Sequence, residues 1–109
     1  MANKEKALGL LTICRRAGRL TIGFDASMDS VRTGTAHAVV TAEDISAKTA
    51  KEALFISSKH GVPVLHGDIL MEELFHCFGK TVGIMAVCDK GFAAKLREYL
   101  DETISADAE

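Results

Sequence analysis

The sequence of 109 residues has no tryptophan, only 6% aromatic residues and a single proline. A surface of stacked aromatic rings for single-stranded nucleic acid is therefore not expected. Nearly half of the residues, 48%, are hydrophobic, which supports one compact domain with a core and leaves little room for a linker. We predict a single domain over residues 1–100 and an acidic tail over residues 101–109 that frays.

Cysteine is also scarce and unpatterned. The three cysteines, Cys14, Cys77 and Cys88, form no CxxC motif, so we expect no disulfide framework, no metal site and no cofactor. The apolar run at residues 7–14 is short, is broken by Gly9 and is followed at once by two arginines, which argues against a signal peptide and a membrane span. We therefore expect a cytoplasmic protein with reduced thiols and no membrane partner.

The formal net charge of −2 is distributed unevenly along the chain. Without the four acidic residues of the last nine positions, the sum 13 − 15 = −2 becomes 13 − 11 = +2. The overall charge therefore neither supports nor excludes a nucleic-acid partner.

Hydrophobic periodicity and the positions of glycine predict alternating helices and strands. Ser46 and Asp89 are suitable N-caps, and glycines follow several of the apolar stripes. With their caps, the predicted helices span residues 4–17, 23–34, 46–60, 67–79 and 89–100, and the predicted strands span residues 20–22, 38–41, 62–65 and 82–88. We predict five helices around a sheet of four strands.

The turn from the short strand at residues 20–22 into the next helix is the first candidate binding site. Gly23 opens this helix, and the unpaired amides and positive dipole end of a helix N-terminus suit phosphate. Arg15, Arg16 and Arg19 lie just upstream. The first two also suit the negative C-terminal end of the preceding helix, and both interpretations of the arginines stay open.

The segment at residues 79–83 is the second candidate, because two glycines flank a lysine and a short apolar side chain. In such a loop Val82 could press on an exposed base while Lys80 reaches a phosphate, although the residues alone favour an ordinary tight connection. Gly79 and Lys80 do not complete a nucleotide-binding loop, since Leu74 stands where that motif needs glycine. We find no catalytic arrangement and expect no enzyme; His66, near a strand end, is the only histidine retained as a ligand contact.

Several blocks together resemble one known family. The sequence is similar to ribosomal proteins of the L7Ae type, in particular to their bacterial YlxQ-like branch, over residues 4–100. This resemblance implies a three-layer α/β/α sandwich around a four-stranded mixed sheet, and binding to RNA kink-turns. The blocks that carry it are residues 10–11, residues 14–20, Gly23, residues 42–44, residues 79–80 and residues 89–93.

The resemblance also implies an RNA motif at the start of the second helix, Gly-x-Asn-Glu-x-x-Lys. Carried over by position, it falls on Gly23, Asp25, Ala26 and Asp29, so that only the glycine is retained. An ionised aspartate accepts hydrogen bonds but donates none, and alanine offers no side-chain hydrogen bond. Residues 79–82 correspond to the loop that meets an extruded base in the family.

We therefore predict a non-enzymatic protein that binds structured RNA, with ribosomal RNA among the candidates, through a degenerate kink-turn motif. An alternative is a protein-interaction module on the same fold that has lost kink-turn recognition and binds a protein partner. An accessory domain of an RNA-modifying enzyme is a third, weaker interpretation. The candidate RNA-binding residues are Arg16, Arg19, Gly23, Asp25, Ala26, Asp29, Gly79, Lys80 and Val82.

Overall fold

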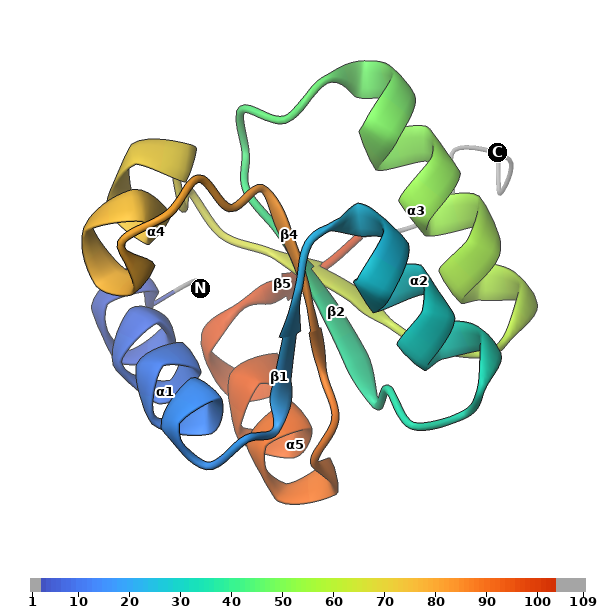
Figure 1. Cartoon of the computed structure of the whole chain (residues 1–109), viewed down its shortest axis with the longest axis horizontal. Helices are drawn as coiled ribbons and strands as arrows, with labels where there is room; N and C mark the ends of the chain where they lie inside the picture. Colours follow the sequence, from blue (N-terminus) through green and yellow to red (C-terminus); the bar gives the residue numbers. More distant parts are fainter. Residues whose placement is uncertain (1–2, 104–109) are drawn as a thin grey trace.

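The computed structural model describes residues 3–103 and contains five helices that alternate with strands (Figure 1). The helices are α1 (Lys4–Arg16), α2 (Phe24–Arg32), α3 (Ala47–Lys59), α4 (Met71–Phe78) and α5 (Lys90–Tyr99). The strands are β1 (Leu20–Ile22), β2 (Ala38–Thr41), β3 (Val64–His66), β4 (Ile84–Val87) and β5 (Asp101–Glu102). Among the described residues, no helix is long and apolar enough to cross a membrane.

The sheet is mixed and has the strand order β1-β4-β2-β3-β5. Strands β2 and β3 are parallel, and the other neighbouring pairs are antiparallel. The prediction of four strands is wrong, because Asp101 and Glu102 pair with His66 and Leu65 of β3 as a fifth strand. The amide of Thr103 continues this pairing by donating to the Val64 carbonyl at 2.7 Å. Aspartate and glutamate are uncommon in strands, so the sequence does not predict a strand at these positions. They pair here because the outer edge of β3 has backbone groups that are otherwise unpaired.

The fifth strand begins at the residue where the acidic tail was predicted to begin. Residues 101–103 are therefore attached to the sheet. The rest of that segment, residues 104–109, lies outside the described residues, and the prediction that it frays stays a prediction.

Two apolar cores lie on opposite faces of the sheet, so the predicted three-layer α/β/α architecture is confirmed. On one face, α1, α4 and α5 contribute Leu11, Leu74 and Leu96, and on the other, α2 contributes Met28 and Val31 (Figure 1). All five of these side chains are at most 1% exposed. Alternating residues of the central strands serve the two cores, as the pleat of a strand requires.

The predicted N-caps of α3 and α5 are confirmed. The Ser46 hydroxyl accepts from the Thr49 amide at 3.2 Å, and the Asp89 carboxylate accepts from the Phe92 amide at 2.9 Å. The predicted start of the fourth helix is too early, because the chain turns at Asp68 with φ = +57° before α4 begins at Met71.

Candidate nucleic-acid interface

Backbone hydrogen bonds bring four connecting segments together at one end of the sheet. The Gly23 amide donates to the Ile84 carbonyl at 3.0 Å, the Ala42 amide to the Gly83 carbonyl at 2.8 Å, and the Glu43 amide to the Ile69 carbonyl at 2.7 Å. We call this surface the loop end; it consists of the start of α2 and residues 42–46, 67–70 and 79–83. It is the upper end of the molecule in Figure 1.

Gly23 fixes how α2 starts at the loop end. Its φ of +100° lies where side chains other than glycine are strained, although a Cβ atom there would meet nothing within 4 Å. The glycine is therefore needed for the backbone conformation and not for space. Directly after it, Asp25, Ala26 and Asp29 lie exposed on the first turns of α2. Asp29 is also 3.5 Å from the guanidinium of Arg32.

The loop at residues 79–83 contains two glycines, one required by the backbone conformation and the other by close packing. Gly79 ends α4 with φ = +74°, in the left-handed region that favours glycine. A Cβ atom at Gly83 would lie 2.7 Å from Cγ2 of Ile45, so a larger residue would push this loop away from residues 42–46. Lys80 is exposed between them, as its proposed phosphate contact requires.

The structure corrects the role given to Val82. Its side chain is only 1% exposed and packs in the core with Leu74 and Met85. In this conformation it offers no surface to a base. Val82 therefore belongs to the core, although the strand itself begins only at Ile84.

The structure also separates Arg16 and Arg19 from the other predicted contact residues. The Arg19 carbonyl accepts from the Cys88 amide at 2.8 Å, just beyond the C-terminal end of β4, whereas Gly23 bonds to Ile84 at its start. The whole length of β1 therefore lies between Arg19 and Gly23. Both arginines are exposed at the opposite end of the sheet from the loop end.

The sequence does not indicate a contact between Arg15 and the end of α4, and the structure shows one. Its Nη1 donates to the Phe78 carbonyl at 3.2 Å, and its guanidinium carbon lies 5.3 Å from the centre of the Phe78 ring. These contacts tie the end of α1 to the residue that precedes Gly79. Since the two residues are 63 positions apart, no local pattern in the sequence could have indicated the contact.

Acidic side chains dominate the loop end. Hydrogen bonding to Asp68, together with repulsion from Asp68 and Asp44, raises the pKa of Glu43, while His66 opposes this shift. Such a shift indicates a locally negative potential. The exposed carboxylates at this end are those of Asp25, Asp29, Glu43, Asp44 and Asp68.

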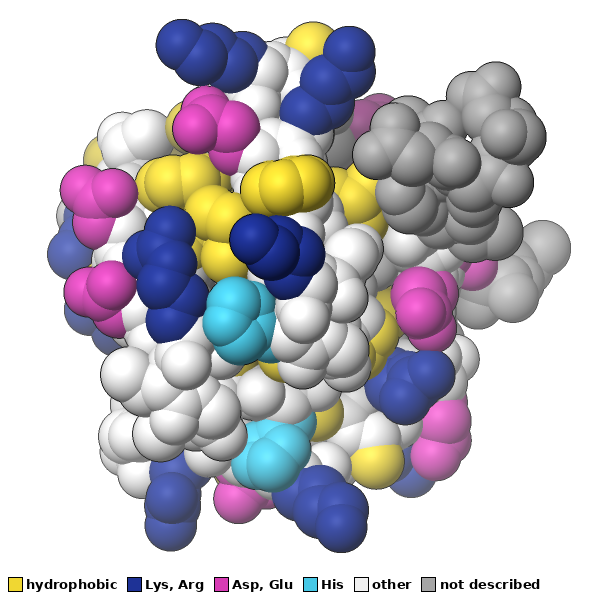
Figure 2. All heavy atoms as spheres, turned by 90° about the vertical axis from the view of Figure 1, so that its right-hand side faces the viewer, with side chains coloured by type: hydrophobic (Ala, Val, Ile, Leu, Met, Phe, Trp, Pro, Cys, Tyr) yellow, Lys and Arg dark blue, Asp and Glu magenta, His cyan; other side chains and the backbone are white. Residues whose placement is uncertain are grey.

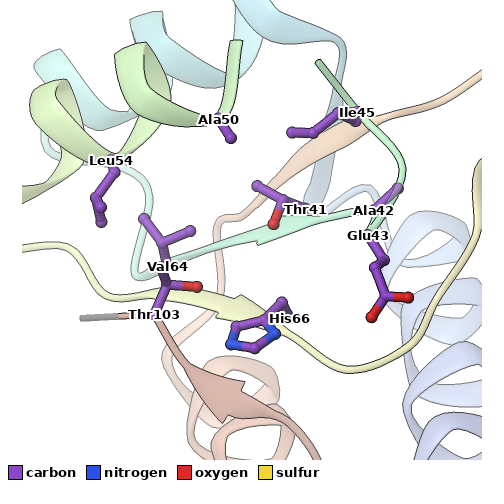
Figure 3. Close-up of a pocket in the computed structure, with 9 residues that line it drawn as sticks. All are labelled: Thr41, Ala42, Glu43, Ile45, Ala50, Leu54, Val64, His66 and Thr103. Carbon is purple, nitrogen blue, oxygen red and sulfur yellow. The ribbon is translucent and has the colours of Figure 1, made fainter. Parts of the chain in front are cut away.

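A hollow of about 240 Å³ opens between α3 and the neighbouring ends of β2 and β3 (Figure 3). Its walls are mainly the apolar side chains of Ile45, Leu54 and Val64, and Thr41 and His66 are among its polar groups. His66, the histidine singled out in the sequence, therefore lines a surface depression. Within residues 3–103, no group of three histidine, cysteine or acidic side chains is placed to hold a metal ion.

These features define a small α/β/α sandwich whose candidate interface is a set of loops at one end of a mixed sheet. The chain belongs to the ribosomal protein L7Ae/L30e/S12e/Gadd45 family, whose model matches residues 5–97. Its relatives include the RNA-binding protein YlxQ of Enterococcus faecium, which is 31% identical over 100 residues, with 91% of this chain and 95% of that protein covered. The RNA-binding protein YlxQ of Bacillus subtilis (strain 168) is 31% identical over 97 residues, with 84% and 92% covered.

Solved structures agree with this assignment. A protein of unknown function from Bacillus halodurans C is 27% identical, with a TM-score of 0.81 over 86% of this chain and 95% of that one. The Giardia lamblia 15.5kD RNA binding protein is 15% identical, with a TM-score of 0.73 over 93% and 92%, and supports the fold alone. The predicted resemblance to the L7Ae type and its YlxQ-like branch is confirmed. None of these names describes an enzymatic activity.

Proposed function

We propose that this protein binds structured RNA and catalyses no reaction. The observation that carries the proposal is the 31% identity to the RNA-binding protein YlxQ of Enterococcus faecium, over nearly the whole length of both chains. Ribosomal RNA is one candidate within this class of partner. We further propose that the protein acts in the cytoplasm.

The loop end is the proposed contact surface. Gly23 and Gly79 turn the chain with positive φ at this end, and the first turns of α2 and Lys80 are exposed beside them. Lys80 supplies a phosphate contact, and Gly23 lets the RNA backbone approach the start of α2. Asp25, Ala26 and Asp29 are exposed on that same helix, so two carboxylates face the ligand. Recognition of a standard kink-turn should accordingly be poor.

Binding to a structured RNA of defined sequence at several salt concentrations tests this function. Lys80→Ala should weaken binding to different RNAs alike, and should lower the salt slope by about one phosphate contact, because it removes one cation from the interface. Lys51→Ala, at an exposed position on α3, is the matched control. If the wild-type protein binds no structured RNA at low salt, the proposed function is wrong. An unchanged slope in Lys80→Ala would remove only this contact.

A protein-interaction module is the second candidate, and the carboxylates of the loop end favour it. Asp25, Asp29, Glu43, Asp44 and Asp68 suit a basic protein partner better than a phosphate backbone. Affinity capture followed by nuclease treatment separates the two functions. A partner that stays bound without RNA, and is released by Asp25→Asn with Asp68→Asn, would support this alternative.

A further inference from the structure

Two of the sequence blocks that carry the family resemblance, residues 14–20 and residues 89–93, lie outside the loop end. The structure joins them at the opposite end of the sheet. The Arg19 carbonyl accepts from both the Cys88 amide, at 2.8 Å, and the Cys14 thiol, at 3.3 Å. The loop before β2 completes this surface, since the His37 amide donates to the Val87 carbonyl at 2.8 Å.

This surface is basic, and we call it the basic end; it consists of residues 16–19, 33–37 and 88–91. Arg16, Arg19 and Lys90 are exposed on it. Its one acidic residue, Asp89, already accepts the Phe92 amide as the cap of α5. None of the four ion pairs among residues 3–103 includes any of the three cations. Along the lower edge of Figure 2, at the same end of the molecule as the lower end of Figure 1, Lys or Arg and His side chains lie beside an acidic one, and Lys or Arg side chains also lie along the upper edge.

Local structure explains only part of this charge. Arg16 lies in the last turn of α1, where a cation complements the negative end of the helix dipole. Lys90 is the first residue of α5, at the positive end of a helix dipole, where a cation is unfavourable. Arg19 follows the end of α1, which it helps to close through its amide, a donor to the Cys14 carbonyl at 3.0 Å, and not through its guanidinium. Neither a helix dipole nor an ion pair among residues 3–103 therefore accounts for the charges of Arg19 and Lys90.

We propose that the basic end is a second RNA-contacting surface, on which Arg19 and Lys90, with Arg16, bind phosphates of the RNA backbone. This inference rests on the proposed function, and it adds a contact surface separated from the loop end by the length of the sheet. The charge distribution favours it, because the carboxylates of the loop end repel phosphate while the basic end attracts it. An arginine fork and a lysine ammonium both match phosphate oxygens.

The decisive variant is Arg19→Glu with Lys90→Glu, compared with the control Lys48→Glu with Lys51→Glu, which makes the same charge change on exposed residues of α3. Filter binding to one structured RNA, at four or more salt concentrations, gives affinity and salt slope together. We expect the basic-end variant to lose at least about tenfold in affinity at low salt, and its salt slope to fall by about two phosphate contacts. The loss should multiply with that of Lys80→Ala, because the two surfaces are far apart.

Unfolding measurements test whether a variant loses RNA binding only because it no longer folds. Lys90→Glu places an anion at the start of α5, which the helix dipole favours. The melting temperature of this variant should therefore equal or exceed that of the wild-type protein, while its RNA affinity falls. Arg19→Lys with Lys90→Arg keeps both charges and should retain most of the binding. If the wild-type protein binds RNA and the basic-end variant binds equally well, this inference is wrong and the proposed function stands. An equal loss in the α3 control would also overturn it, because the effect would then be one of net charge.

Discussion

Rebuilding the family motif on α2 tests whether its loss determines RNA preference. The triple variant is Asp25→Asn, Ala26→Glu and Asp29→Lys, and all three positions are exposed. The first substitution would restore a donor, the second would restore an acceptor for a base edge, and the third would present a cation where the wild-type protein presents a carboxylate. We expect the variant to bind a standard kink-turn more tightly than the wild-type protein does.

The magnitude follows from the exposure of Asp29. Its side chain is 77% exposed, so its interaction with a phosphate about 4 Å away is close to the aqueous value of about 1 kcal/mol. Reversing the sign of the charge doubles the difference to about 2 kcal/mol, or about thirtyfold in affinity at low salt. The lost contact with Arg32, an exposed pair at 3.5 Å, costs about 0.2–0.5 kcal/mol of helix stability and does not offset this gain.

Calorimetric titration with one kink-turn RNA and one straight duplex, each at two salt concentrations, measures the effect. Glu52→Lys, which makes the same charge change on α3, is the control for non-specific attraction. The gain should be larger for the kink-turn than for the duplex, and should shrink as salt rises. Tight kink-turn binding by the wild-type protein would show that the motif does not fall on these positions. Equal gains on both RNAs would show that the substitutions only add charge.

Three further predictions concern stability and reactivity. Gly79→Ala should destabilise the fold by about 1 kcal/mol, because φ at this position is +74°. Gly9→Ala should stabilise the fold by about 0.5–1 kcal/mol, because Gly9 lies inside α1 with open space around it. Urea unfolding measures both effects. At pH 8 iodoacetamide should label exposed Cys77 long before Cys14, because burial raises the pKa of the Cys14 thiol to about 11; equal rates would contradict the burial. The Leu70 amide and the Lys4 ammonium lower the pKa of Glu73, so its contribution to stability is present above its ordinary value of 4.5 and is lost as the pH falls below it. The Glu73→Gln variant should be less stable than the wild-type protein at neutral pH. The difference in stability between the two proteins should become smaller in acid, as thermal unfolding across pH would show.

Local chemistry was enough to predict most of the fold. Ser46 and Asp89 could be recognised as caps because a side-chain oxygen at that position satisfies an amide of the same helix. The spacing of Met28 and Val31 identified the buried face of α2 for a similarly local reason, the period of the helix. Strand β5 could not be predicted in this way, since Asp101 and Glu102 pair only because a strand far away in the sequence has an open edge.

The candidate site was predictable only in part, because it depends on which ends of the strands meet. Arg19 and Gly23 are only four positions apart in the sequence, yet they lie at opposite ends of the sheet because β1 runs between them. Val82 belongs to an apolar run that indicates burial as readily as base contact, and the structure shows it buried. The contact between Arg15 and Phe78 arises from helix packing, which no spacing in the sequence encodes.

The strand order has a consequence for how the chain folds during its synthesis. Strand β4 lies between β1 and β2 and pairs with both, although most of the chain is made before it. A nascent chain that ends before Ile84 can form α1 and α2, but β1 then lacks its partner and β2 keeps an open edge. The pairing that joins β1 to β2 must therefore wait until β4 has left the ribosome. Truncated chains that stop within α4 should associate with one another through these strands instead of forming stable monomers.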